Sequence, residues 1–280
     1  MTPLERVPQL AQEWGLENLW VKNETLNLSG SFKDRGAIVA VREARHAGFK
    51  AIVTASSGNA GAAVAAHAAR AGLQCTVVVG PHAPLQKLRQ IRSYGAEIRT
   101  VEGLFDQPAD SFIDQLWHIA KELDAYLAFF WEPVNPAIIQ GFEVIAEEIV
   151  RQLGRAPDVV LIPTGGGDHL VAHARAYLRL WRTGVIDFVP QLIAVQPEGA
   201  CPLIDALHHD WPEVRYRPNP ETIASGLRVA FSGDHALHLM RHPEGTRRPH
   251  VALTVSDDDI RRTQSLLGSR EGLWVEPSGP

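Results

Sequence analysis

Residues 51–79 read AIVTASSGNAGAAVAAHAARAGLQCTVVV, and the fold prediction starts from this stretch. The runs Ala51–Ala55 and Thr76–Val79 are short and rich in β-branched residues, which is typical of strands, and the alanine-rich run Ala60–Ala71 predicts a helix between them. A strand, a helix and a second strand in succession form the unit from which parallel sheets are built. The stretch therefore predicts an α/β fold.

The same alternation continues on both sides of this stretch. Further strands are predicted at Leu19–Lys22, Glu97–Val101, Tyr126–Phe130, Val159–Pro163, Leu192–Gln196, Val251–Val255 and Leu273–Val275. Further helices are predicted at Lys33–Ala47, Leu85–Ser93, Ser111–Leu123, Pro136–Leu153 and Leu170–Arg182, and Ser256 with three aspartates behind it predicts a capped helix start. This order favours parallel or mixed sheets flanked by helices.

The strand–helix series divides the chain into two predicted domains. Residues 36–133 form a compact series that ends at the break WEP, residues 131–133. We expect residues 1–35 and 134–280 to combine into a second, larger domain. Residues 199–245 are dense in proline and histidine, and we expect them to form substrate-facing loops.

Composition excludes several classes of protein. The net charge of -5 gives no reason to expect nucleic-acid or membrane binding, and no apolar run reaches the roughly 18–20 residues that a transmembrane helix needs. The N-terminus lacks the charged start and apolar stretch of a signal peptide. Cys75 and Cys201 are the only cysteines, so no disulfide framework is possible. We expect a cytoplasmic protein.

The stretch SGSFKDRG, residues 29–36, places Lys33 on the first turn of a predicted helix. The chain has only five lysines against 22 arginines. A lysine amine can lose its proton when desolvated and can then attack a carbonyl, whereas a guanidinium cannot. Lys33 is therefore a candidate for amine chemistry, and the aldehyde of pyridoxal phosphate is the carbonyl that we expect it to bind.

Two later loops join a predicted strand to a predicted helix. In ASSGNAG, residues 55–61, the amides and hydroxyls at the helix start form a seat for a carboxylate; the alternative is that Ser57 or Asn59 only caps the helix. In PTGGGDH, residues 163–169, three glycines let the backbone approach a phosphate closely; the alternative is a flexible turn. Neither loop contains the dinucleotide-binding pattern G-x-G-x-x-G.

In their order and spacing, the three loops resemble those of the fold-type II pyridoxal-phosphate enzymes, which have a tryptophan synthase β-like fold. Within that family the chain looks most like the threonine synthases. The resemblance extends from the opening TPL, residues 2–4, to EPSG, residues 276–279. It implies a carbon–oxygen lyase that acts on a small amino-acid substrate, converts O-phosphohomoserine to threonine by phosphate elimination and water addition, and forms a homodimer.

The resemblance also implies roles for individual residues. Lys33 would bind the cofactor as an internal Schiff base and move protons at the substrate carbon, and Asn59 would donate to the phenolic oxygen of the cofactor ring. The cofactor phosphate would be bound by Gly165, Gly166, Gly167 and the adjoining backbone of Asp168 and His169. The substrate would be bound by Ser56, Ser57, Gly58, Asn59, Ala60 and Lys87, the last near a substrate phosphate or simply exposed on its helix.

The chain departs from the threonine synthases in several places. These enzymes commonly carry an arginine where Ile138 stands, and the surrounding stretch IIQG, residues 138–141, looks like that of serine and threonine dehydratases. The stretch ETIASGL, residues 221–227, leans the same way. A serine or threonine ammonia-lyase is therefore the alternative function. Asp168 stands where relatives carry a neutral residue, and we expect its carboxylate to point away from the phosphate and to cap the helix.

Two further alternatives remain open. The chain ends at Pro280, before the segment with which relatives continue, so a truncated homologue that binds the cofactor without turnover is one of them. A nucleotide-binding α/β protein is another. His169 and His173 are four residues apart, which suits one helix face and a zinc ion, but no third ligand completes a motif, and we expect no metal site.

Overall fold

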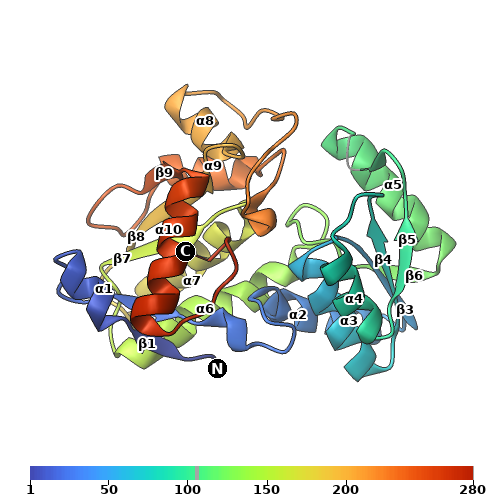
Figure 1. The fold of residues 1–280 in the computed structure, drawn as a ribbon, viewed down its shortest axis with the longest axis horizontal. Helices are drawn as coiled ribbons and strands as arrows, with labels where there is room; N and C mark the ends of the chain where they lie inside the picture. The colour runs from blue at the N-terminus through green and yellow to red at the C-terminus, as the bar shows by residue number, and fades with distance from the viewer. Residues whose placement is uncertain (105–106, 280) are drawn as a thin grey trace. The chain divides into compact units, whose positions relative to one another are not determined.

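The computed structural model describes residues 1–104 and 107–279 and divides into two compact units (Figure 1). Unit 1 combines Met1–Asn23 with Glu143–Pro280, and unit 2 is Glu24–Phe142. The predicted boundaries after residues 35 and 133 both fall inside unit 2. The physical reason is that helix α2 (Lys33–His46) runs through the first boundary, and that Ile138 at the start of α6 (Ala137–Leu153) shares a hydrophobic core with α2.

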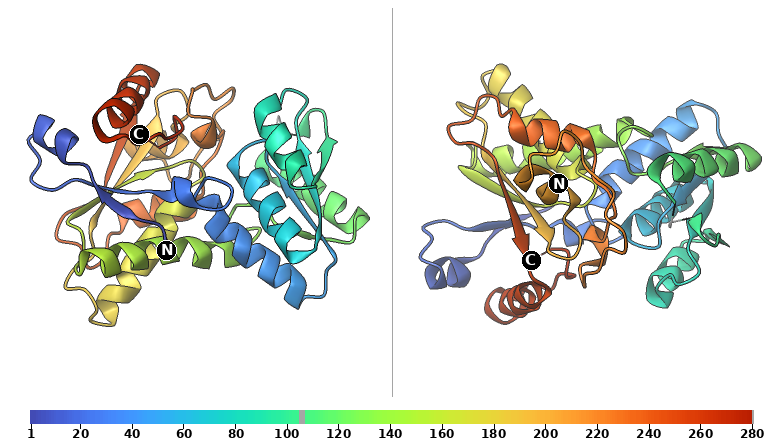
Figure 2. Two further views of the ribbon diagram at one scale, coloured as in Figure 1. Left: turned by 60° about the horizontal axis from the view of Figure 1, so that its bottom comes forward. Right: turned by 90° about the horizontal axis from the view of Figure 1, so that it is seen from above.

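Unit 2 is built on a parallel sheet of strand order β5-β4-β3-β6. Its strands are β3 (Ala51–Ala55), β4 (Gln74–Val79), β5 (Glu97–Thr100) and β6 (Ala125–Leu127). Its other helices are α3 (Asn59–Ala71), α4 (Leu85–Ser93) and α5 (Ala109–Glu122). Side chains of neighbouring strand residues point to opposite faces of this sheet, since Ile52 packs with α2 and α3 whereas Val53 packs with α5. Helices therefore cover both faces, as predicted (Figure 2).

Unit 1 contains a second parallel sheet of order β7-β8-β9 and a two-stranded antiparallel sheet. The strands are β7 (Val159–Pro163), β8 (Gln191–Pro197) and β9 (Val251–Val255), and β1 (Leu4–Arg6) with β2 (Trp20–Lys22). The helices are α1 (Pro8–Glu13), α7 (Asp168–Arg182), α8 (Pro202–His208), α9 (Asp234–Arg241) and α10 (Asp257–Glu271), with most of α6. Helices α7, α8 and α9 share one core with β7 and β8.

Contacts between distant segments explain why unit 1 contains the start of the chain. The Leu10 amide on α1 donates to Glu271 at the end of α10, at 2.8 Å. The Lys22 ammonium donates to the Thr2 carbonyl and to the Glu148 carboxylate on α6, both at 2.7 Å. Lys22 and Glu148 are both almost fully buried, so this ion pair fastens the N-terminal strand to α6.

The α/β prediction is confirmed, and Ala51–Ala55, Val159–Pro163 and Val251–Val255 are strands with the predicted bounds. The predicted strand Leu273–Val275 is wrong. Helix α10 ends at Gly272 in a left-handed conformation with φ 69°, and the chain that follows is irregular, with Trp274 82% exposed. The sequence analysis missed β1, α1, α8 and α9, which are too short for a strong periodic signal.

The predicted cap at the start of α10 is confirmed. The Asp259 amide donates to Ser256 Oγ at 3.1 Å, and Ser256 Oγ donates to the Asp259 carboxylate at 2.8 Å. This reciprocal pair satisfies a backbone donor at the helix start and explains the aspartates there as structural residues.

Replacing Ser256 with alanine should lower the free energy of unfolding by about 1 kcal/mol, because the first turn of α10 loses this acceptor. Urea denaturation followed by circular dichroism measures the change. Ser265→Ala, an exposed serine in the middle of the same helix, is the control and should cost nothing. Equal losses for both variants would contradict the capping role.

Burial makes both cysteine thiols unreactive. It raises the pKa of Cys75 to about 12, and burial together with the charge of Asp205 raises the pKa of Cys201 to about 11. Both remain thiols at neutral pH, so neither is a nucleophile. In the described part of the chain, every helix is too short or too polar to span a membrane.

Candidate active site

Lys33 is the first residue of α2, and its amine lies among aromatic rings. Its Nζ is 4.6 Å from the ring centroid of Phe32 and 5.3 Å from those of Phe130 and Phe142. The last two rings can approach because Gly36 has no side chain; a Cβ there would lie only 2.9 Å from Phe130 and 3.0 Å from Phe142. The amine is therefore half-buried beside a largely apolar wall.

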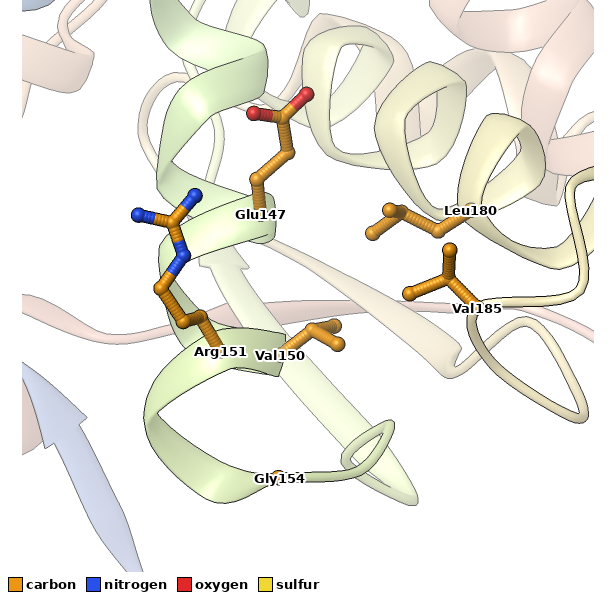
Figure 3. A pocket seen from close by; sticks show the side chains of 6 residues that line it. All are labelled: Glu147, Val150, Arg151, Gly154, Leu180 and Val185. Carbon is orange, nitrogen blue, oxygen red and sulfur yellow. The ribbon is translucent and has the colours of Figure 1, made fainter.

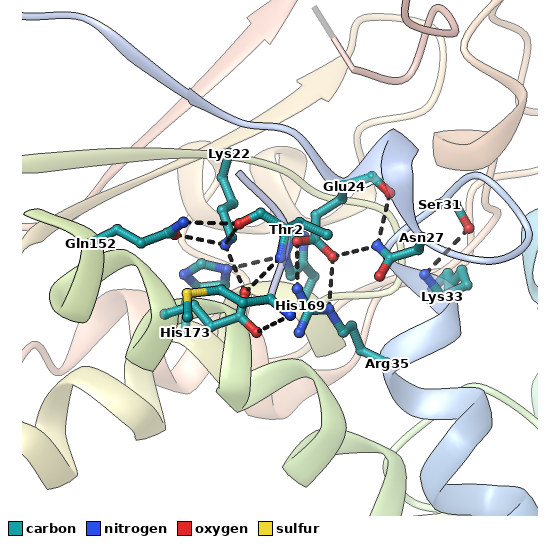
Figure 4. A network of polar contacts seen from close by, with 12 residues as sticks. Thr2, Lys22, Glu24, Asn27, Ser31, Lys33, Arg35, Gln152, His169 and His173 are labelled. Carbon is teal, nitrogen blue, oxygen red and sulfur yellow. Dashed lines mark hydrogen bonds and ion pairs between the residues drawn. The ribbon is translucent and has the colours of Figure 1, made fainter. Parts of the chain in front are cut away.

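Hydrogen bonds also fix the backbone around Lys33. Figure 4 shows Ser31, whose Oγ accepts from the Lys33 amide at 3.3 Å. The Arg35 guanidinium pairs with Glu24 at 3.0 Å, and Glu24 also accepts from Asn27 (Figure 4). The first turn of α2 is thus tied to the loop before it.

Asp34, the residue after Lys33, carries a buried carboxylate. It accepts from Ser29 Oγ at 2.7 Å and from the Ser29 amide at 3.0 Å, and it lies 2.9 Å from His67 Nε2 on α3. Burial by itself would raise the pKa of this carboxyl, but the hydrogen bonds from His67 and Ser29 outweigh it and hold the pKa below its ordinary value of 3.8.

This pKa shift predicts an acid-sensitive contribution to stability. Because the folded-state pKa of Asp34 is depressed, the carboxylate stabilises the fold above the unfolded-state pKa and loses that contribution as pH falls through the folded-state pKa. Between about pH 5 and pH 3, the free energy of unfolding should fall more steeply for the wild type than for Asp34→Asn. Urea titrations at each pH measure both slopes, and parallel slopes would contradict the prediction.

The second predicted loop joins β3 to α3. Helix α3 begins after Gly58, which holds the N-cap position and has no side chain, so neither Ser57 nor Asn59 occupies that position. Ser56 Oγ instead accepts from the Gly58 amide at 3.2 Å. A Cβ at Gly61 would overlap the Ser56 carbonyl oxygen, so only glycine lets the helix fold back so closely on the strand end.

Lys87 and Asn59 meet at this loop. Lys87 on α4 is half-buried and donates from Nζ to Asn59 Oδ1 at 2.7 Å. An ammonium can only donate, so this bond assigns the amide oxygen of Asn59 to Lys87 and directs its NH₂ group elsewhere. Ser57 and Ala60 lie half-buried on either side of the helix start. The predicted substrate residues therefore form one cluster in unit 2.

The third predicted loop lies in unit 1, between β7 and α7. The Gly165 carbonyl accepts from Ser232 Oγ at 2.7 Å, and the Gly166 carbonyl accepts from the Gly233 amide at 2.9 Å. Gly167 has φ +101°, and a Cβ there would lie 2.7 Å from the Cβ of Ala236, so the position needs glycine for both conformation and space. The loop carbonyls are thus engaged within the protein.

The amides of this loop fit a phosphate. Among the residues that the structure describes, the N–H groups of Gly165, Gly166 and Gly167 have no acceptor, and they lie directly before α7. Nothing lies within 4 Å of the place that a Cβ of Gly166 would occupy. Donors without acceptors at a helix start, beside open space, are suited to bind an anion such as the phosphate of the expected cofactor.

Residues that the sequence analysis missed hold the glycine loop. Gln196 on β8 is fully buried; its Nε2 lies 3.3 Å from both the Gly165 carbonyl and Ser232 Oγ. Its Oε1 accepts from the amides of Leu203 and Ile204 at the start of α8. Neither Gln196 nor Ser232 lies in a recognisable motif, so no local signal identifies them.

Asp168 and His169 begin α7. Asp168 is buried with a carboxylate oxygen 3.4 Å from His235 Nε2 on α9. Gly167 holds the N-cap position of α7 and Asp168 is the first residue inside the helix, so Asp168 does not occupy the predicted cap position. His169 Nε2 lies 3.1 Å from Nε2 of His173. Burial lowers the pKa of His173 to about 4, so His173 is neutral at physiological pH. Within the described residues, no group of three or more His, Cys, Asp or Glu side chains could hold a metal.

One surface hollow lies in unit 1. It has a volume of about 380 Å³ and lies between the end of α6 and the end of α7 in unit 1 (Figure 3). Its lining residues are Glu147, Val150, Arg151, Gly154, Leu180 and Val185. None of the predicted site residues lines it, so we assign it no part in the chemistry.

Comparison with curated proteins finds threonine synthases. The chain is 36% identical over 281 residues to the threonine synthase of Methanocaldococcus jannaschii, an alignment that covers 99% of this chain and 66% of that enzyme. It is 33% identical to the threonine synthase of Mycobacterium leprae, with 99% and 72% covered. The chain thus spans about two thirds of the length of the curated relatives that it matches.

Comparison with solved structures finds a racemase and a deaminase with a similar fold. Maize serine racemase aligns with a TM-score of 0.81 at 25% identity, covering 99% of this chain and 78% of that one. A threonine deaminase from T.th. aligns with a TM-score of 0.80 at 28% identity, covering 99% and 83%. A family model described as pyridoxal-phosphate dependent enzyme matches residues 1–280. Since that match runs from the first residue to the last, the chain belongs to the family of pyridoxal-phosphate dependent enzymes.

Proposed function

We propose that this protein is a lyase of amino-acid metabolism in which Lys33 holds pyridoxal phosphate. The observation that carries the proposal is the position of the Lys33 amine, half-buried at a helix start and within 5.3 Å of three phenyl ring centroids. The amine of a lysine attacks an aldehyde once it has lost its proton, and a half-buried lysine at a helix start is placed to do so. Bound pyridoxal phosphate supplies an electron sink for the carbanion formed at the substrate carbon.

The other predicted residues bind and orient. We assign the cofactor phosphate to the N–H groups of Gly165, Gly166 and Gly167 and the adjoining backbone of Asp168 and His169, because the glycine amides lack acceptors among the described residues. We assign the phenolic oxygen of the cofactor to the Asn59 NH₂, since Lys87 occupies the amide oxygen. The start of α3, whose N-cap Gly58 has no side chain, would hold the substrate carboxylate through Ser56, Ser57, Gly58 and Ala60.

The leading reaction is that of a threonine synthase. O-phosphohomoserine would lose its phosphate and gain water, giving threonine. The names of the curated relatives support this choice. A cation near the substrate loop supports it as well, since Lys87 lies beside Asn59 and could attract a phosphorylated substrate.

A serine or threonine ammonia-lyase is the second candidate, and Ile138 favours it. Threonine synthases commonly carry an arginine there, but Ile138 is 0% exposed and packs in the core that contains Ala37 and Ala40. A buried isoleucine cannot bind a phosphate. Loss of water from serine or threonine, followed by hydrolysis of the resulting imine, gives a 2-oxo acid and ammonia, and this reaction needs no phosphate site.

Steady-state assays of the purified chain with added pyridoxal phosphate separate the candidates. Phosphate release and threonine formation from O-phosphohomoserine would support the synthase. Ammonia and 2-oxo acid from serine or threonine, without phosphate release, would support the ammonia-lyase. Visible cofactor absorbance without either product would support a homologue that only binds. An absence of cofactor binding would refute all three.

We further propose that the protein is a cytoplasmic homodimer. The family resemblance supports the dimer, and the two free cysteines are compatible with a reducing compartment. Sedimentation velocity at micromolar concentration tests the assembly, and a monomer at all concentrations would contradict it.

A further inference from the structure

One polar network links the helices that carry the proposed cofactor and substrate residues in unit 2. Asp34 on α2 contacts His67 on α3 at 2.9 Å and Ser29 at 2.7 Å. The side chain of Asp34 is 5% exposed and that of His67 is 13% exposed. A buried carboxylate is stable only while its donors remain in place, so this contact holds α2 and α3 in one relative position.

The network continues onto α4. Gln90 Nε2 donates to the Ser29 carbonyl at 3.0 Å. Lys87, one turn earlier on α4, donates to Asn59, and Asn59 begins α3, the helix that carries His67 two turns later. The contacts therefore close a ring, in which Asp34 directly follows Lys33 in the chain and Lys87 contacts Asn59 of the substrate loop.

We propose that Asp34 is a positioning residue, which acts through His67 and Ser29 to hold the Lys33 amine in register with Asn59 and the substrate loop. This inference rests on the proposed function only in taking Lys33 and Asn59 as cofactor residues. Asp34 itself would not contact the cofactor. Its carboxylate accepts hydrogen bonds from Ser29 and His67. These two residues lie on the loop before α2 and on α3, and both segments must stay in place when an amine substrate replaces Lys33.

The chemistry of the contact separates positioning from simple stabilisation. His67→Gln keeps an N–H donor, whereas His67→Leu removes the donor at similar volume. Asp34→Asn keeps the shape of the carboxylate but removes its charge and one of its acceptors. If donation to Asp34 positions the site, His67→Gln should restore what His67→Leu loses, and the double variant His67→Leu/Asp34→Asn should lose no more than either single variant.

Two measurements on the full chain test this. The first is the rate at which added pyridoxal phosphate gains the visible absorbance of the Lys33-bound form. The second is amide hydrogen exchange, without cofactor, in peptides covering residues 29–36 and 56–62. We expect His67→Leu and Asp34→Asn to bind pyridoxal phosphate about tenfold more slowly, because each loses a hydrogen bond to a charged group. Both variants should also exchange amide hydrogens faster in both peptides. His67→Gln should stay within about threefold of wild type.

Asp114→Asn, an exposed carboxylate on α5 of the same unit, is the control and should change neither measurement. Variants that lose only thermal stability, with unchanged binding rate and unchanged exchange in residues 56–62, would overturn the proposal. Additive losses in the double variant would also overturn it. A wild type without Lys33-bound absorbance would refute the proposed function instead, and the hydrogen exchange would still decide whether Asp34 controls the substrate loop. If Asp34→Asn does not fold, the two His67 variants carry the test.

Discussion

Lys33→Ala is expected to remove the visible absorbance of the protein with pyridoxal phosphate and to lower turnover by about 10³-fold or more. The amine has two tasks in the proposed function, to hold the cofactor aldehyde and to move a proton at the substrate carbon. Alanine can do neither. The three phenyl rings beside the amine carry no group that could act as a replacement base.

Absorbance spectra before and after borohydride reduction, followed by mass spectrometry of the peptide that contains residue 33, measure this prediction. Wild type should carry a reduced cofactor on Lys33, and the variant should carry none. Lys50→Ala is the matched control, because Lys50 is an exposed lysine of the same unit and should leave spectrum and turnover unchanged. Equal absorbance in Lys33→Ala and wild type would remove Lys33 from the mechanism.

Gly141→Ala should lower the free energy of unfolding by about 3 kcal/mol, because a Cβ at this position would overlap the backbone carbonyl of Arg35. Gly141 lies on α6 and Arg35 on α2, so the extra methyl group must push the two helices apart. A backbone carbonyl cannot rotate away as a side chain can. Since Arg35 is two residues from Lys33, the displaced turn should also weaken binding of pyridoxal phosphate.

Gly268→Ala provides the control for this substitution. Gly268 is also helical, in α10, but the nearest atom to its added Cβ would be 3.9 Å away. Alanine there should raise the free energy of unfolding by up to about 1 kcal/mol, because it removes a flexible residue from a helix without a clash. Urea denaturation compares both variants. A Gly141→Ala protein that unfolds at the wild-type urea concentration would show that the close helix approach is dispensable.

Several parts of the fold could be predicted because their signals are local. Ala51–Ala55 and Val159–Pro163 are uninterrupted apolar strands, and Ser256 with Asp259 is a cap whose two partners are three residues apart. By contrast, α8 and α9 are short helices whose buried residues gain their stability from the core of unit 1. Trp274 lies in a predicted strand that has no partner among the described strands, so its β propensity is not realised.

The sequence by itself determined where the candidate site residues stand, since Lys33, the loop at residues 56–60 and the three glycines each lie at a junction whose type the flanking residues dictate. Tertiary structure alone decided what surrounds them. Phe130 and Phe142 reach Lys33, and His67 reaches Asp34, from segments that are distant along the chain. Such contacts depend on how helices pack, and packing is set by side-chain volumes and by glycines that no local pattern relates to one another.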